Sequence, residues 1–285
     1  MTAKDAGRDA RATAKNAEGE ARGKAKQVSD SGWFRALVMG GLITVGVVHC
    51  LVGVLALQMA WSGTPDKEAD QKGALGAIAS NPFGGVLLWI VAVALTGLVI
   101  WKLTQAWWGY GYESKKSKRI RKRIGSVGGA IAYGVLAVTA IRFSVGDSGQ
   151  SSDQQQQSRV GELLSEPFGQ VLALVLAAAV VGYGAVLIKR GVTASFVREF
   201  EGEPAAAIKR LGQVGHIAKG IAIGLVGVLF GWAAISYDPQ KAAGLDDALR
   251  LVKEQPAGPV MLTLIAVGLI AYGLYCFGWS RHARR

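Results

Sequence analysis

The sequence predicts an all-α, polytopic membrane protein with six transmembrane helices, arranged as three tandem two-helix hairpin repeats in a pseudo-threefold bundle. Three observations lead to this prediction. The 285 residues are 51% hydrophobic and only 18% charged. The charges gather in connecting stretches and leave six apolar runs of about 20 residues, which is the length of helix that crosses a bilayer core about 30 Å thick. A Pro-x-Gly motif, followed by an apolar run, occurs three times.

The six apolar runs are the expected membrane spans. None of them contains Asp or Glu, and an acidic side chain at mid-bilayer costs at least about 2.5 kcal/mol. The runs are apolar nearly all round, whereas helices of a soluble bundle alternate polar and apolar faces. We therefore expect spans at residues 35–61, 85–108, 125–146, 171–188, 212–235 and 260–279.

Lysine and arginine are divided unequally between the two ends of these spans. One side holds 23 of the 32 basic residues, in 1–35, 111–123, 189–210 and 281–285, while 62–84, 147–169 and 236–259 hold six. Because positive loops stay inside, we expect a multi-pass protein of the plasma (inner) membrane with both termini in the cytoplasm. An even number of spans agrees with that orientation.

The Pro-x-Gly motif marks the outer end of each even-numbered span, at Pro82, Pro167 and Pro256, with spacings of 85 and 89 residues. Proline suits the first turn of a helix, and we expect the glycine to remove bulk where the chain enters the membrane. Apolar residues at helical spacing before each proline predict a short amphipathic helix on the outer surface. These residues are Leu75, Ile78 and Ala79, then Val160, Leu163 and Leu164, then Leu249 and Val252.

The odd-numbered spans carry small residues at i, i+4 and i+7: Gly46, Cys50 and Gly53, then Ala130, Gly134 and Ala137, then Gly220, Gly224 and Gly227. Spans associate in lipid through close packing, which glycine permits. We expect helix packing at Gly46, Gly53, Gly134, Gly220, Gly224, Gly227 and Gly231, so that leucine at Gly224 would push two helices apart. A glycine-lined central pathway is the alternative.

These repeats divide the chain into six parts. We expect a disordered cytoplasmic tail at 1–32, repeat 1 at 33–112, a basic cytoplasmic linker at 113–122, repeat 2 at 123–191, a cytoplasmic linker at 192–209 and repeat 3 at 210–285. The tail is polar and alanine-rich, with seven basic and five acidic residues in its first thirty. The polar run SSDQQQQS at 151–158 is also expected to be unstructured.

The repeat VGHIAKGIAIGLVGVL, together with its Pro-x-Gly partner, resembles the family catalogued as domain of unknown function 1206. The resemblance covers about 35–279. It implies membrane location and three two-helix units per chain, as in actinobacterial members, and it implies no activity. The second unit departs from the family's pattern, because Ala130 and Ala137 stand where the family tends to have glycine.

Ionisable residues within the spans are candidates for function by default. Lys102, Lys219 and Arg142 lie near span ends, so we expect them to extend to the headgroups; His216 also lies near the cytoplasmic surface. His49 differs, because it lies halfway along the first span, where Tyr133 and Ile223 stand in the other units. A proton relay or haem ligand needs a partner, so a hydrogen-bonded structural histidine is favoured over an intramembrane polar site.

The densest polar feature is the run ESKKSKRIRKR between the second and third spans. It fixes topology, and we expect it also to contact anionic lipid headgroups, at about 1 kcal/mol per basic residue near the surface. The residues are Lys115, Lys116, Lys118, Arg119, Arg121, Lys122 and Arg123. The net charge of +12 therefore does not indicate nucleic-acid binding.

The sequence shows no phosphate loop, no metal-ligand cluster and no nucleophile–base set. We therefore expect no enzyme activity, no cofactor and no metal. The favoured hypothesis is an accessory or scaffold subunit of a larger inner-membrane assembly, respiratory or of the cell envelope, with other membrane proteins as partners. The alternative is a small transporter or channel for a hydrophobic or lipidic solute, since transport of ions normally needs charged groups in the membrane.

Overall fold

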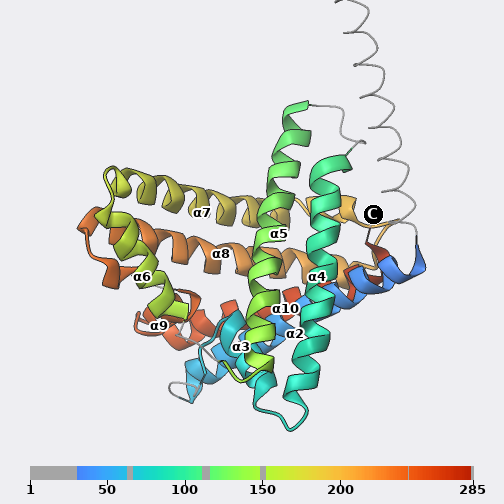
Figure 1. Cartoon of the computed structure of the whole chain (residues 1–285), viewed down its shortest axis with the longest axis horizontal. Helices are drawn as coiled ribbons and strands as arrows, with labels where there is room; N and C mark the ends of the chain where they lie inside the picture. Colours follow the sequence, from blue (N-terminus) through green and yellow to red (C-terminus); the bar gives the residue numbers. More distant parts are fainter. Residues whose placement is uncertain (1–30, 63–66, 111–115, 148–151, 243, 284–285) are drawn as a thin grey trace, which may run out of the picture.

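A computed structural model describes residues 31–62, 67–110, 116–147, 152–242 and 244–283 (Figure 1). These residues form nine α-helices and two short 3₁₀-helices, joined by turns and loops. In chain order they are α2 (Gly32–Trp61), α3 (Gln71–Ala79), α4 (Gly84–Trp108), α5 (Lys116–Ser144), α6 (Ser152–Ser165), α7 (Gly169–Val192), η1 (Ser195–Glu199), α8 (Ala206–Ser236), η2 (Pro239–Lys241), α9 (Leu245–Lys253) and α10 (Gly258–His282).

Six of the helices, α2, α4, α5, α7, α8 and α10, are long and apolar enough to cross a membrane. The prediction of an all-α, six-span membrane protein is thus confirmed. The basic stretch before the third span is a correction to the predicted boundaries. Residues 116–122, expected as a linker, form the first two turns of α5. The tail at 1–30 and residues 113–115 lie outside the described residues.

The three repeats are related by how their spans pack. In each repeat the second span packs against the first span of the next, which gives the extensive pairs α4 with α5, α7 with α8 and α10 with α2. The last pair returns to the start of the chain, so the three interfaces follow one another cyclically, as a pseudo-threefold arrangement requires.

Packing inside each repeat is unequal. The spans α8 and α10 share a large interface and α2 and α4 a smaller one, whereas α5 and α7 share at most a marginal contact among the described residues. In Figure 1, α4 and α5 run across the direction of α7 and α8. The second repeat is therefore not closed by an interface between its own two spans.

Glycine accounts for the closest interfaces. A Cβ on Gly46 would lie 2.8 Å from the carbonyl oxygen of Gly273 in α10, and a Cβ on Gly220 would lie 2.7 Å from that of Gly184 in α7. These pairs occupy equivalent positions in the repeats. At the α4–α5 interface the equivalent residues are Ala130 and Val99, so side chains stand there between the two backbones.

The other glycines that were expected to pack helices fall into two groups, with and without a close neighbour. A Cβ on Gly53 would lie 2.8 Å from the Ala266 oxygen, and one on Gly227 would lie 2.8 Å from the Val181 nitrogen. A Cβ on Gly231 or Gly134 would make only ordinary contact, at 3.4 and 4.0 Å, and one on Gly224 would meet nothing within 4 Å. Gly224 does pack against α7 through its backbone, since a Cβ on Gly184 would lie 3.0 Å from the Gly224 nitrogen. The space at its own Cβ is free, so a small side chain there would meet no helix.

The Pro-x-Gly motif forms a tight turn rather than the first turn of a helix. Each glycine is the first residue of its span, and its N–H donates to the carbonyl of the residue before the proline: Gly84 to Asn81 at 2.8 Å, Gly169 to Glu166 at 2.9 Å and Gly258 to Gln255 at 2.7 Å. A Cβ on Gly258 would lie 2.0 Å from the Lys253 oxygen. Glycine is needed because the short helix's backbone passes directly against this turn.

The short helices α3, α6 and α9 confirm the predicted amphipathic segments, and Leu75, Val160 and Leu249 are buried on them. They close the end of the bundle opposite the two termini of the described chain (Figure 1). The prediction that 151–158 is unstructured is wrong, since α6 begins at Ser152. The polar run extends a helix whose C-terminal half packs Val160 and Leu164 against α8.

A pair of substitutions on α8 tests the backbone contact. Gly220→Ala should lower the stability of the folded protein by about 1–3 kcal/mol, because the new methyl group collides with the Gly184 carbonyl. Gly224→Ala, one turn away, should leave stability unchanged or raise it, because Cβ space is free there and alanine favours a helix. Thermal unfolding in detergent measures both variants. Equal stabilities would contradict a backbone-to-backbone crossing of α7 and α8.

Candidate functional site

A buried polar cluster lies within the half of the bundle that carries the N-termini of α2 and α8. We call His49 of α2, His216 and Lys219 of α8, and Tyr272 and Tyr275 of α10 the tyrosine–histidine cluster. The α2–α10 and α8–α10 interfaces bring these residues together from the first and third repeats. Both histidines and both tyrosines are buried, and Lys219 is half-buried.

His49 makes a contact on each ring nitrogen. Nδ1 lies 2.7 Å from the Val45 carbonyl oxygen. A carbonyl can only accept, so Nδ1 carries the proton and Nε2 is the acceptor. The ammonium Nζ of Lys219 lies 2.9 Å from Nε2 and donates to it. The imidazole also packs 4.7 Å from the Tyr272 ring. The midspan histidine thus has a partner, which the sequence did not reveal.

Lys219 does not extend to the headgroups as expected. Its ammonium lies 4.2 Å from the centre of the Tyr272 ring, besides donating to His49. The expectation fails because α8 packs closely on α10 one turn before Lys219. A Cβ on Gly215 would lie only 2.5 Å from the Tyr272 Cα. Among the described residues, no Asp or Glu forms an ion pair with Lys219.

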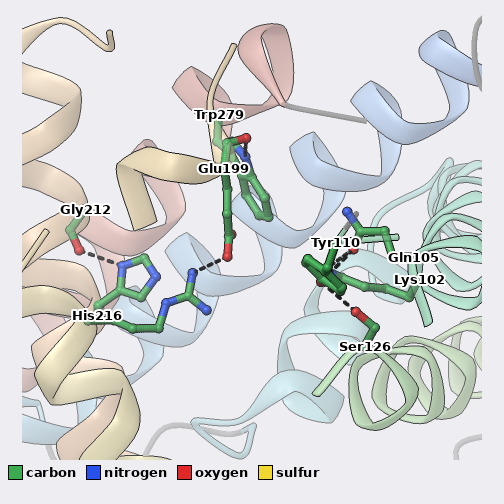
Figure 2. Close-up of polar contacts among 9 residues, drawn as sticks. Lys102, Gln105, Tyr110, Ser126, Glu199, Gly212, His216 and Trp279 are labelled. Atoms are coloured by element: carbon green, nitrogen blue, oxygen red, sulfur yellow. Dashed lines mark hydrogen bonds and ion pairs between the residues drawn. The ribbon is translucent and has the colours of Figure 1, made fainter. Parts of the chain in front are cut away.

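His216 is enclosed rather than exposed at the surface. Its Nδ1 donates to the Gly212 carbonyl at 2.7 Å, as Figure 2 shows. Its ring stacks on Phe196 of η1, with centroids 4.7 Å apart and planes 6° from parallel. The rings of Tyr272 and Tyr275 approach it edge-on, both at 5.2 Å. The helix η1 therefore covers the cluster at this end of the bundle.

An ion pair holds η1 in place. Arg190, near the end of α7, lies 3.0 Å from the Glu199 carboxylate, and Trp279 Nε1 donates to the Glu199 carbonyl at 3.3 Å (Figure 2). Burial raises the pKa of the Glu199 carboxyl, but the Arg190 guanidinium, helped by Lys102, outweighs burial and holds that pKa below its usual value. Glu199 follows the span, and sequence reasoning did not single it out.

The other two intramembrane cations lie nearer the ends of the spans. Lys102 donates to the Gln105 side chain at 3.2 Å and lies 4.6 Å over the Trp101 ring. Tyr110 joins this group to α5, since its hydroxyl lies 2.7 Å from Ser126 Oγ and 3.3 Å from Gln105 Oε1 (Figure 2). Arg142 is exposed and pairs with Asp147 at 3.5 Å.

The predicted lipid-contacting run lies mostly on the first two turns of α5. Lys116 and Arg121 are exposed, and Arg119, Lys122 and Arg123 are half-buried. Lys122 lies 5.2 Å over the Tyr110 ring. Lys115 and the side chain of Lys118 lie outside the described residues.

The chemistry available to the tyrosine–histidine cluster is hydrogen-bond donation and positive charge in an apolar setting. No group of three or more His, Cys, Asp or Glu suited to a metal ion occurs in the part of the chain that the structure describes. Sequence reasoning missed the contact of His49 with Lys219. The sequence did contain an indication of it. The positions equivalent to Lys219 in the other two repeats hold Val45 and Gly129, and a lysine in one repeat alone indicates that it has a role the other repeats lack.

The contact between His49 and Lys219 gives a prediction. His49→Gln keeps an acceptor for the ammonium and should be tolerated, whereas His49→Leu should lower stability by about 1 kcal/mol, the scale of an interhelical hydrogen bond in a membrane. The destabilisation by His49→Leu should vanish in a Lys219→Met background, as a double-mutant cycle of thermal unfolding would show. If His49→Gln folds normally but abolishes the protein's cellular phenotype, the histidine acts as a proton carrier or ligand.

Comparisons with known proteins agree with the architecture. The family described as Domain of Unknown Function (DUF1206) matches residues 40–109, 124–194 and 214–282, which are the three repeats. The uncharacterized protein YxxB of Bacillus subtilis is 31% identical over 248 residues, which is 85% of this chain and 89% of the relative. No solved structure matches. Three successive matches and a relative of nearly the same length show that the chain belongs to the DUF1206 family.

Proposed function

We propose that the protein is a non-enzymatic accessory or scaffold subunit of a larger inner-membrane assembly, respiratory or of the cell envelope. The observation that carries this proposal is a small-residue face on the second repeat that stays exposed among the residues the structure describes. On α7, Ala178, Gly182 and Ala185 follow the i, i+4, i+7 spacing and are all exposed. A Cβ on Gly182 would meet no atom within 4 Å.

The same spacing has a clear use elsewhere in the molecule. On α2 and α8 it lets one backbone approach another, as at Gly46 and Gly220. Spans recognise each other in lipid through such faces. The two spans of the second repeat also bury only 22% of their apolar windows, against 56% for α2 and α10. A transmembrane helix of a partner protein is therefore the occupant we assign to this face of α7.

A substitution on α7 tests this assignment. Gly182→Leu should abolish recovery of the partner after gentle solubilisation of native membranes, because leucine blocks backbone approach, and it should leave thermal stability unchanged. Val186→Leu, at a position 51% exposed, is the matched control and should retain the partner. The proposal is wrong if the wild-type protein is recovered alone at monomer mass, or if Gly182→Leu retains the same complex.

A second candidate function is a small transporter or channel for a hydrophobic or lipidic solute. The observation that favours it is the buried polar tyrosine–histidine cluster in a bundle whose spans α5 and α7 share at most a marginal contact. Flux of such a solute into liposomes that contain only the purified protein would support this function over a scaffold.

The orientation is part of the proposal, with both termini in the cytoplasm and the basic run of α5 at the anionic headgroups of the inner leaflet. Single cysteines test it. A cysteine at Ser117 should be labelled only from the cytoplasmic side and a cysteine at Ser165, which precedes the second Pro-x-Gly turn, only from outside. Both serines are exposed. The reverse labelling pattern would contradict the orientation.

A further inference from the structure

We propose that the tyrosine–histidine cluster binds the acid group of a singly charged membrane amphiphile through the Lys219 ammonium. This site is independent of the scaffold function proposed for the outer face of α7. It rests on three properties of the cluster, which are an unneutralised cation, a buried hydroxyl without a hydrogen-bond partner, and an apolar surrounding that lies within the spans.

The cation comes first. An ammonium group has three hydrogens. One of those on Lys219 is donated to His49 Nε2 at 2.9 Å, and the Tyr272 ring faces the nitrogen at 4.2 Å. Neither partner carries a negative charge. Charges inside a membrane are normally paired with each other or with a ligand, and no carboxylate of the described residues pairs with this lysine.

Two buried donors accompany the cation. The Tyr275 hydroxyl and the Trp101 Nε1 are enclosed and have no hydrogen-bond partner, and their residues are only 1% and 2% exposed. Both belong to one apolar cluster with Tyr272, in which Trp279 links them at ring distances of 5.9 and 5.8 Å. A buried donor left unpaired costs about 1–3 kcal/mol. Tyr275 belongs to the tyrosine–histidine cluster, whereas Trp101 lies beyond Trp279. An acid group bound at Lys219 would recover the energy at the Tyr275 hydroxyl.

The charge of the ligand follows from its surroundings. Arg190 and Glu199 neutralise each other at 3.0 Å, and Nε2 of His49 is an acceptor rather than a second cation. Lys102 lies at the other end of the apolar cluster, over the Trp101 ring. At Lys219 itself one positive charge therefore remains, and one negative charge balances it. The carboxylate of a fatty acid and the phosphodiester of an acidic phospholipid share this chemistry.

The hydrocarbon part of the ligand follows from the position of the cluster. Its donors lie on membrane spans and pack among aromatic and aliphatic side chains, with Lys102 over the Trp101 ring. The described residues of this apolar cluster come from α2, α4, α5, α8, α10 and η1, with none from α7. Within the tyrosine–histidine cluster Lys219 is half-buried while the histidines and tyrosines are buried, so an acyl chain would approach from the bilayer on the side of Lys219.

Binding can be measured on the purified full-length chain in neutral detergent. The probe is dibromostearic acid, and its methyl ester is the uncharged twin. Bromine quenches nearby tryptophan, and Trp101 and Trp279 lie in the cluster. The acid should raise the unfolding temperature and quench fluorescence, whereas the ester should do neither. Nanodiscs with brominated phosphatidylglycerol or brominated phosphatidylcholine show whether an acidic phospholipid is the natural source.

Variants of α8 make the test specific. Lys219→Met should weaken binding of the acid by roughly tenfold to hundredfold, the scale of a charge-assisted hydrogen bond. Lys209→Met removes the same charge at an exposed position of the same helix and should bind normally. If Lys219→Met does not fold, Tyr275→Phe removes only a hydroxyl and should weaken binding several-fold. The proposal is overturned if acid and ester act alike, if Lys219→Met and Tyr275→Phe bind as the wild type does, or if inorganic phosphate alone gives the same stabilisation.

Discussion

The contact between the first and last spans is the constraint on which the site depends. Gly46 and Gly273 let the backbones of α2 and α10 touch, and no side chain could stand between them. This contact makes the three repeats cyclic and brings the midpoint of α2 within side-chain reach of Lys219 on α8. A hydrogen bond weakens within a few tenths of an ångström beyond its optimum. The 2.9 Å contact of Lys219 with His49 therefore requires the glycine contact one turn away on the same helix.

The intramembrane lysine is the costliest residue of this arrangement. A cation at mid-span costs at least about 2.5–3.5 kcal/mol on insertion scales. A cation–π contact returns up to about 2 kcal/mol when it is desolvated, and the hydrogen bond to His49 returns about 0.6–2 kcal/mol. This hydrogen bond requires an unprotonated Nε2 on the histidine. The Val45 carbonyl favours that tautomer because it accepts a hydrogen bond from Nδ1. His49 thus stabilises the packing of the spans and also holds the Lys219 ammonium inside the bundle.

Much of the fold follows from patterns along the chain. Apolar runs without acids define the spans, and the repeated Pro-x-Gly defines the units, because both signals depend on local chemistry. The contact of Lys219 with His49 joins residues 170 positions apart, and no periodicity reports such a distance. Gly224 shows a different limit. A repeated small residue indicates that a helix packs, but the rotation of the helix about its axis decides at which of its glycines a Cβ would collide with the neighbour.

The second repeat departs from the symmetry of the other two, and the departures are related. Ala130 and Val99 separate the backbones of α4 and α5 where the other interfaces have glycine pairs. The spans α5 and α7 of this repeat are not held together as a hairpin. Helices that share one bilayer tilt by about 0–40°, so the α4–α5 pair, which runs across α7 and α8 (Figure 1), is the part whose orientation a bilayer or a partner helix can set. The first and third repeats supply the polar interior, and the second supplies the exposed face of α7.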